Sequence, residues 1–275
     1  MHFIKRLSKN RSAMVGAVIV LIIFFSALGA PILAPYDVNA QNLTMSLQPP
    51  STSHLLGTDV YGRDLLSRLI YGARVSLGIG LSAAFIATTV GVFVGVFAGF
   101  LGGWVDWLLM RIVDVLMGFP RLVVMLLAVG FGTPSIWLTL TVLGLLAWME
   151  VARIVRGEVM VIREMLYLKA AQALGLKRSR IIMGYILPNV IGSVIVSTTL
   201  LIGTMILVEA SLSFLGLGVQ PPNASWGTIL NQGRVDPVGA WWISAFGGLM
   251  IIITVVGFNL LGDGLRDLLD PRSLT

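Results

Sequence analysis

The chain has 275 residues, of which 56% are hydrophobic and 12% are charged, about half the charged fraction of an average soluble domain. This number of charges is too small to cover the surface of a water-soluble globule of this size. The composition therefore excludes a water-soluble globular protein and indicates a membrane protein. The absence of cysteine excludes disulfides, thiolate metal sites and thiol nucleophiles.

Motifs that carry chemistry are also missing. No Gly-Lys pair occurs, so the chain has no P-loop with which to hold ATP phosphates. The hydrolase, zinc-protease and dinucleotide patterns G-x-S-x-G, H-E-x-x-H and G-x-G-x-x-G do not occur either. The two histidines, His2 and His54, have no partner at metal-ligand spacing. We therefore expect no catalytic residue, no cofactor and no metal site.

Six stretches are apolar enough to cross a hydrocarbon layer, which takes about 20 residues of helix. The third is extended backward over Arg111 and Asp114, because a turn at Gly132-Thr133-Pro134-Ser135 would otherwise leave it too short. The predicted helices, in chain order, are 14–33, 77–101, 107–130, 136–152, 190–209 and 241–261.

Basic residues before the first helix set its direction. Lys5, Arg6, Lys9 and Arg11 precede it, and positive charge stays on the cytoplasmic side, so we expect a cytoplasmic N-terminus. A cleavable signal peptide has a similar layout of basic, apolar and small residues, but we expect a retained anchor. Alternation then places 153–189 and 262–275 in the cytoplasm, and 34–76, 131–135 and 210–240 outside.

The remaining charges agree with this topology. The net charge of +6 comes from 19 Lys and Arg against 13 Asp and Glu. The outer segment 34–76 balances three arginines with three aspartates, whereas the inner segment 153–189 carries seven Lys and Arg. The basic excess therefore indicates membrane topology and not nucleic-acid binding.

Within the second helix, Gly91, Gly95 and Gly99 recur at every fourth position. Small residues at this spacing let the backbones of two helices approach closely. The close approach is either a pore or dimer seam or, more simply, packing within this chain.

Within the third helix, Arg111 and Asp114 lie one turn apart, and Arg121 follows on roughly the same face. Ionisable groups inside a membrane helix are costly and are usually paired or turned toward water. These residues either line a substrate path or form a structural pair near the cytoplasmic end, and the second is the simpler interpretation.

The inner segment 153–189 is too long for a plain connector. Residues 163–174 are good helix formers, and Gly175 supplies a stop after them. A second helical piece is expected over Lys177–Tyr185, ending before Pro188. The segment therefore predicts a helix–glycine–helix elbow at the cytoplasmic face, too small for a domain and suited to docking.

The elbow resembles the EAA loop of permease subunits of bacterial ABC importers. The matching residues are Lys169-Ala170-Ala171, Gly175 and Ile186-Leu187-Pro188, with Lys169 in place of the family's Glu. In that family the loop contains a coupling helix that docks on the ATP-binding subunit. The resemblance thus implies that coupling to an ATPase, centred on 163–180, involves Leu166, Lys169, Ala170, Ala171, Gly175, Leu187 and Pro188.

Three further stretches resemble the C-type subunit of the oligopeptide, dipeptide and nickel permeases of this family. They are residues 54–64 running on to 72–77, residues 211–222, and residues 258–267 followed by Asp270-Pro271-Arg272. Considered without the resemblance, Gly57-Thr58-Asp59 and Gly62-Arg63-Asp64 predict capped turns before an interfacial helix that presents Leu65, Leu66, Leu69 and Ile70 on one side.

The resemblance implies an all-α membrane protein of six transmembrane helices, like the permeases of type I ABC importers, with a cytoplasmic coupling loop at about 153–189. We expect an anchor helix and external loop in residues 1–76 and the permease core in residues 77–275. The implied partners are a homologous second permease, two ABC ATPases, an external solute-binding protein and the lipid bilayer of the bacterial inner membrane, with no nucleic acid.

The predicted function is to translocate a di- or oligopeptide that an external binding protein delivers and that partner ATPases drive. A nickel, metal-chelate or glutathione importer of the same family, a stand-alone secondary transporter and a membrane-embedded enzyme are the alternatives. Ser197, Thr198 and Asn259 are candidate pathway residues, although polar side chains at such depths more often bond neighbouring helices.

Overall fold

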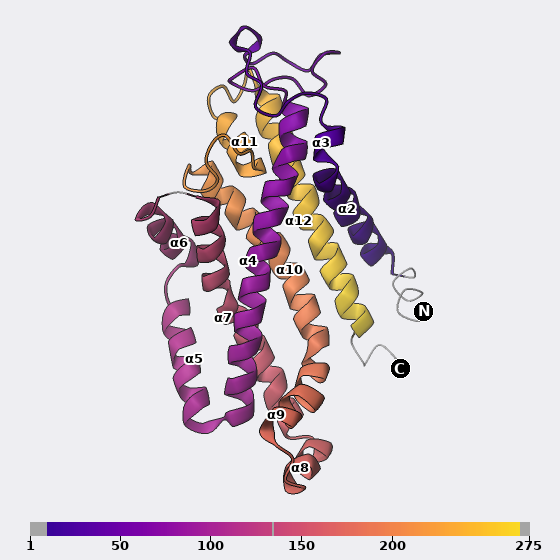
Figure 1. Ribbon diagram of the computed structural model, residues 1–275, viewed down its shortest axis with the longest axis vertical. Helices are drawn as coiled ribbons and strands as arrows, with labels where there is room; N and C mark the ends of the chain where they lie inside the picture. The colour runs from indigo at the N-terminus through magenta and orange to yellow at the C-terminus, as the bar shows by residue number, and fades with distance from the viewer. Residues whose placement is uncertain (1–9, 134, 270–275) are drawn as a thin grey trace.

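The computed structural model describes residues 10–133 and 135–269. Several residues used above lie outside these ranges: His2, Lys5, Arg6, Lys9, Pro134, Asp270, Pro271 and Arg272. Within the described ranges the chain forms helices and loops, with one isolated bridge between Thr58 and Asp64 and no strand. Figure 1 shows an elongated bundle that α8 closes at one end and residues 34–64 cover at the other.

The elements in chain order are α2 (Arg11–Leu28), α3 (Ala30–Leu33), the 3₁₀ turn η1 (Leu43–Met45), α4 (Leu65–Leu101), α5 (Gly103–Met117), α6 (Arg121–Gly130), α7 (Ile136–Arg163), α8 (Leu166–Ala173), α9 (Arg178–Ile181), the π turn η2 (Ile182–Ile186), α10 (Leu187–Phe214), α11 (Trp226–Gln232) and α12 (Trp241–Leu269).

Among the described residues, five helical runs are long and apolar enough to cross a membrane: α2, α4, α7, the run from α9 through α10, and α12. The pair α5 and α6 passes the same test jointly but is bent by 80°, and counting it as one span gives six. The expected all-α membrane architecture is confirmed.

The second membrane helix is longer than predicted. It begins at Leu65 and not at residue 77, because Asp64 caps it by accepting a hydrogen bond from Ser67 N at 2.8 Å. The predicted cap at Asp64 is thus confirmed, but the separate interfacial helix is wrong: its residues are the first turns of α4. The predicted division between residues 76 and 77 falls inside this helix.

The third predicted helix, 107–130, is two helices and not one. α5 ends at Met117 and α6 begins at Arg121, after Gly118-Phe119-Pro120. Pro120 has no N–H to continue the helical ladder and disfavours helical geometry at Phe119, which explains the bend.

The inner segment is more helical than predicted. α7 continues from Ile136 to Arg163, well beyond the predicted end at residue 152. The predicted stop before Pro188 is also wrong, because the run from Arg178 to Phe214 is continuous. A π turn precedes the proline, with Leu187 N bonded to Ile182 O, and carries the helix past it.

The glycine row of α4 packs against α7. A Cβ added at Gly91 would lie 2.6 Å from Val151 Cβ, and one at Gly95 would lie 2.6 Å from Ala152 O. A Cβ at Gly99 would lie 2.8 Å from Val159 Cβ. Distances this short leave no room for a side chain, so these glycines allow close packing within the chain, the simpler of the two interpretations.

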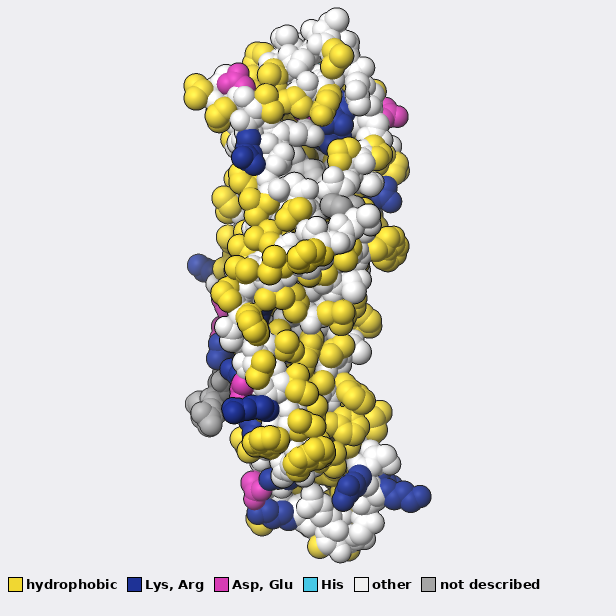
Figure 2. Space-filling view, turned by 90° about the vertical axis from the view of Figure 1, so that its left-hand side faces the viewer, with side chains coloured by type: hydrophobic (Ala, Val, Ile, Leu, Met, Phe, Trp, Pro, Cys, Tyr) yellow, Lys and Arg dark blue, Asp and Glu magenta, His cyan; other side chains and the backbone are white. Residues whose placement is uncertain are grey.

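Charge is unevenly distributed along the bundle. In Figure 2, hydrophobic side chains cover most of the middle of the face seen there, and lysines and arginines gather toward the α8 end. An apolar belt with a basic margin is typical of a helical membrane protein whose basic end faces the cytoplasm.

Candidate functional site

The α8 elbow forms at the end of the bundle, where α7 stops. The backbone N–H of Glu164 closes the last turn of α7, and Met165 is extended, which redirects the chain into α8. Figure 1 shows α8 projecting beyond the ends of the neighbouring long helices. The predicted helix is therefore present, but it begins at Leu166 and not at residue 163.

α8 has an anchored face and an exposed face. Leu168 is fully buried in the main apolar cluster, which also holds Ile181 and Ile186, and Ala171 is only 5% exposed. Leu166 is 85% exposed. Sequence reasoning placed Ala171 on the docking surface, but the structure turns it toward its own chain.

Lys169 and Ala170 of α8 are also exposed, and Leu174, directly after the helix, is 80% exposed. Ala170 alone of the alanine pair therefore offers the small docking surface that the sequence suggested. Exposed apolar side chains on a short helix of this kind are typical of a surface that a partner covers.

Gly175 ends α8 with positive φ, at +74°. Leu176 N bonds to Ala171 O at 3.2 Å, and Gly175 N bonds to Gln172 O at 2.9 Å. These two bonds make a Schellman motif, which satisfies the last carbonyls of the helix and requires the left-handed conformation that glycine adopts without strain. The helix stop predicted at Gly175 is confirmed.

Lys169 has a partner within the elbow. Its Nζ lies 2.9 Å from Glu164 Oε2, and this hydrogen bond and its charge lower the pKa of the Glu164 carboxyl. Both side chains are exposed, so the pair contributes little to stability. The lysine at this position therefore interacts with an acidic residue of its own chain.

Leu187 and Pro188 belong to a different element. They form the first turn of α10, where Leu187 is partly buried and Pro188 is exposed. Tyr185, just before them, stacks on Tyr167 of α8 with ring centroids 6.3 Å apart. This contact connects α8 to the start of the long helix α10.

The candidate pathway residues are not brought together in one cluster of contacts. Ser197 Oγ and Thr198 Oγ1 both donate to the carbonyl of Val194 in their own helix, at 3.1 and 2.6 Å. Thr198 Oγ1 also lies 2.9 Å from Thr88 Oγ1 of α4. Asn259 is exposed on α12. The two hydroxyls are therefore engaged in helix contacts, and a pathway role for all three stays a prediction.

The charged residues of α5 and α6 pair across to α7. Asp114 accepts from Arg153 at 2.7 Å, so the expected pairing of Asp114 with Arg111 is not what forms. Arg121 of α6 bonds to Glu150. Sequence reasoning missed Glu150 and Arg153 as partners because helical spacing shows neighbours within one helix only.

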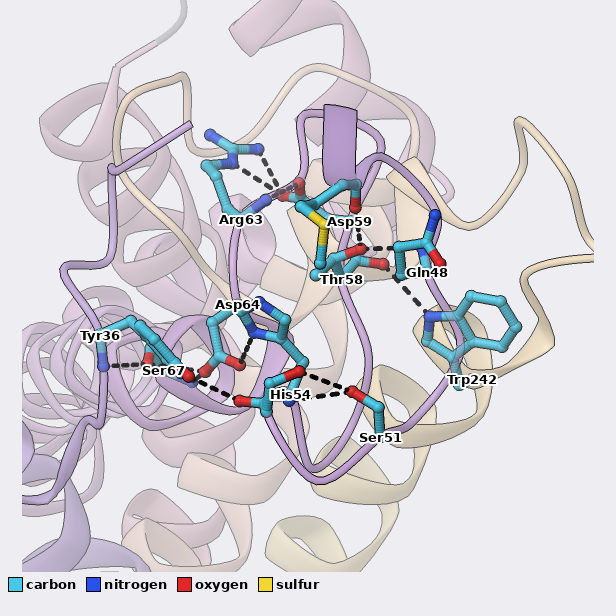
Figure 3. A network of polar contacts seen from close by, with 12 residues as sticks. Tyr36, Gln48, Ser51, His54, Thr58, Asp59, Arg63, Asp64, Ser67 and Trp242 are labelled. Atoms are coloured by element: carbon cyan, nitrogen blue, oxygen red, sulfur yellow. Dashed lines mark hydrogen bonds and ion pairs between the residues drawn. The ribbon is translucent and has the colours of Figure 1, made fainter. Parts of the chain in front are cut away.

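A buried charge network holds residues 34–64 against the bundle (Figure 3). Asp59 is fully buried and accepts from Arg63 Nε at 2.7 Å, while Arg68 Nε of α4 lies 3.3 Å away. His54 Nδ1 lies 2.9 Å from the capping carboxylate of Asp64. Sequence reasoning interpreted the stretches 57–59 and 62–64 as capped turns and did not foresee that Asp59, Arg63 and Asp64 are buried.

Two further contacts link this segment to α12 and to its own turns. Thr58 Oγ1 accepts from Gln48 N at 2.8 Å, and Trp242 Nε1 of α12 donates to Thr58 O at 3.2 Å. The segment is therefore a folded cap and not a loose loop.

A second polar cluster, which sequence reasoning missed, joins α4, α10 and α11. Glu209 is fully buried and accepts from Ser213 Oγ at 2.7 Å and from Ser76 Oγ at 3.2 Å. Trp226 N at the start of α11 donates to the same Ser76 oxygen at 3.2 Å. Glu209 lies in the predicted fifth span, and its charge is the one signal that could have marked it.

Comparisons with known proteins agree with this architecture. A family model described as the binding-protein-dependent transport system inner membrane component matches residues 91–274. A second, described as the N-terminal TM domain of oligopeptide transport permease C, matches residues 2–50.

Among similar proteins, the dipeptide transport system permease protein of Bacillus subtilis (strain 168) is 44% identical over 269 residues, covering 98% of this chain and 84% of that protein. The oligopeptide transport system permease protein of the same organism is 41% identical over 97% of this chain and 88% of that protein. The glutathione transport system permease protein of Escherichia coli O6:K15:H31 (strain 536 / UPEC) is 41% identical over 98% of this chain and 90% of that protein.

Among solved structures, inward-facing MetNI methionine ABC transporter shares the fold. Its matching chain has a TM-score of 0.60 and 17% sequence identity, over 74% of this chain and 97% of that chain.

Proposed function

Because this chain belongs to the family of binding-protein-dependent transport system inner membrane components, we propose that it conducts peptides as one of two permease subunits driven by ATPases docked on α8. The chain is a permease subunit of an ABC importer, a multi-pass protein of the inner membrane. We propose in addition that its substrate is a peptide, that it works with a second permease and two ATPases, and that the ATPases dock on α8.

A peptide substrate is supported by the relatives. Two of them are named for dipeptide and oligopeptide transport and a third for glutathione, which is itself a tripeptide. All are more than 40% identical over nearly the whole chain. We therefore place this chain with the peptide importers and treat a metal chelate as the competing outcome.

The coupling role is supported by the exposed face of α8. Leu166 and Leu174 are apolar and face outward, while Leu168 and Ala171 fix α8 to its own bundle. A helix anchored on one side and apolar on the other can transmit force from a partner into α7 and α10. Closure of an ATPase dimer would then shift the population between inward- and outward-facing states.

Hydrolysis belongs to the partners in this proposal. The sequence has no P-loop, so the purified chain should hydrolyse no ATP by itself and should support hydrolysis only with ATPase subunits. ATP turnover by a preparation shown to lack those subunits would contradict the non-catalytic role.

A crosslinking experiment tests the docking surface. The chain would be assembled with its second permease and ATPases, and single cysteines would be placed at exposed Leu166 and Lys169 and at buried Leu168 as the matched control. The exposed cysteines should bridge to cysteines in the ATPase surface cleft, and Leu168→Cys should not. If no position from 165 to 175 crosslinks while transport persists, α8 is not the coupling element.

Substrate is tested separately with the binding protein and the reconstituted complex. ATP-dependent uptake of labelled di- and tripeptides into lipid vesicles is expected, whereas uptake of a nickel chelate and not of peptides would replace the peptide assignment.

A further inference from the structure

A cavity of about 520 Å³ opens at the bend between α5 and α6. α6 and the residues of the bend form one side, and Leu146, Met149 and Glu150 of α7 with Val208 of α10 form the other. We call it the bend cavity. Its volume is within the range of about 300–1,000 Å³ that small-molecule sites have.

One ion pair supplies the charged groups of the bend cavity. Nη2 of Arg121, the first residue of α6, donates to Oε1 of Glu150. The Arg121 side chain is 26% exposed and that of Glu150 is 46% exposed, so neither is sealed inside the bundle. Because both stand within spans apolar enough to cross a membrane, exposure of these charges to lipid would be costly.

Within the pair, Arg121 begins α6, whereas Glu150 lies far from either end of α7. Glu150 is midway along α7, and the 13 residue steps from it to Arg163 correspond to about 20 Å of helix. Glu150 is the first charged residue of α7 after its apolar half, and Arg153 and Arg156 follow it along the helix. Ionisable groups within membrane helices usually face the bundle interior or a water-filled cavity, and they often mark the route of a polar solute.

The apolar walls of the bend cavity contain three methionines, Met117, Met125 and Met149. Methionine is unbranched and flexible, so a wall built from it adapts to ligands of different shape. A site that must accept many side chains but one invariant set of charges would combine such a wall with one cation and one anion.

We propose that the bend cavity is a station on the transport route where Arg121 binds the terminal carboxylate of a peptide and Glu150 binds its terminal ammonium. In the empty cavity the two side chains neutralise each other, and an arriving zwitterion replaces one ion pair with two. This inference rests on the proposed peptide substrate and assigns the residues that recognise it.

The test uses three tripeptide probes that carry the same central photoreactive benzoylphenylalanine. One has free ends, one has an amidated C-terminus and one has an acetylated N-terminus. Each is delivered by the loaded binding protein to the complete complex in lipid vesicles, and labelling of this chain is located by mass spectrometry. For each probe, labelling of a variant is divided by labelling of wild type. Because the binding protein is the same in both, its own preference among the probes cancels in this ratio.

Labelling of wild type is expected at residues 116–125 and 146–150, next to the methionines. Arg121→Gln should lower labelling by the two probes with a free carboxylate about tenfold and leave the amidated probe unchanged. Glu150→Gln should lower labelling by the two probes with a free ammonium and leave the acetylated probe unchanged.

Arg153→Gln is the matched control. It breaks another ion pair between α7 and the preceding helices, Arg153 to Asp114, which does not line the bend cavity. Its labelling should match wild type for all three probes.

Two results would overturn the assignment while leaving peptide transport intact. If each variant loses labelling equally for all three probes, Arg121 and Glu150 form a structural pair. If label is found only elsewhere in the chain during active uptake, the transport route lies outside the bend cavity. If the wild-type complex takes up no peptide at all, the proposed substrate class itself fails.

Discussion

At the scale of single residues, glycines allow two helix pairs, α4 with α7 and α2 with α12, to pack with their backbones close together. Gly91, Gly95 and Gly99 let α4 lie directly on α7, and Gly16 and Gly257 do the same for α2 and α12: a Cβ at Gly16 would lie 2.5 Å from Leu261 N. Helices in a membrane associate through close packing and not through the hydrophobic effect, so each added methyl group is costly.

Gly95→Ala should destabilise the chain by about 1–3 kcal/mol, because the new Cβ would lie 2.6 Å from the carbonyl oxygen of Ala152, a backbone atom that cannot turn away. Thermal unfolding in detergent measures the loss. Gly157→Ala in α7 is the control, since a Cβ there meets nothing within 4 Å, and its midpoint should equal or exceed that of wild type. Equal midpoints for both variants would contradict this account of the α4–α7 contact.

Gly175→Val should cost about 1–2 kcal/mol locally and reduce transport, because φ at this position is +74°, which valine adopts only with strain. A Cβ there would meet no atom within 4 Å, so no steric clash with neighbours adds to this cost. The penalty is therefore one of backbone conformation alone. Gly175→Asn should retain most transport, since asparagine tolerates the left-handed region. ATP-driven uptake by reconstituted complexes distinguishes them, and equal loss in both variants would show that φ is not the cause.

At the scale of elements, α8 does two things at once. Leu168 and Ala171 hold it to the bundle, and Leu166, Ala170 and Leu174 face away. Adjacent alanines therefore have opposite surroundings, and substitutions at the two positions separate docking from folding.

Ala170→Trp should leave α8 seated and abolish the stimulation of ATP hydrolysis by loaded binding protein, because the bulk is added on the exposed face. Ala171→Trp should instead displace α8, since its site is buried and has no room for an indole. Hydrogen exchange of residues 166–175 reports the difference: slow exchange as in wild type for the first, fast exchange for the second. A fully coupled Ala170→Trp complex would rule out docking through this face.

At the scale of the whole molecule, two ends of different chemistry define the topology. Exposed basic residues surround α8 (Figure 2), whereas at the opposite end the charges of Asp59, Arg63 and Arg68 are internal and paired. A segment whose charges are mutually neutralised is the easier one to move across a membrane, so we propose that residues 34–64 lie outside and that α8 lies in the cytoplasm.

Single cysteines at Ser51 and Ser179 test this orientation, because both positions are exposed and lie at opposite ends of the bundle. With an impermeant thiol reagent and spheroplasts, Ser51→Cys should be labelled and Ser179→Cys should react only after lysis. The native chain has no cysteine, so no background has to be removed. The reverse pattern would invert the topology.

The sequence by itself determined the class of architecture and the elbow before Gly175. These properties depend on local composition: runs of apolar residues, helix formers and a glycine stop are visible within windows of about 20 residues. The family resemblance was equally accessible, because its motifs are short and contiguous.

The sequence did not determine where helices without internal breakers end, so α4 and α7 were both predicted too short. Nor did it show which charges are buried, because burial depends on residues that only the fold brings close. Ser76 and Glu209 are 133 positions apart, and Arg121 and Glu150 come from different helices. Tertiary structure alone decided that Ala171 faces inward, that Asp59 is internal and that Arg121 and Glu150 meet at a cavity, since side-chain partners across helices follow from packing and not from spacing along the chain.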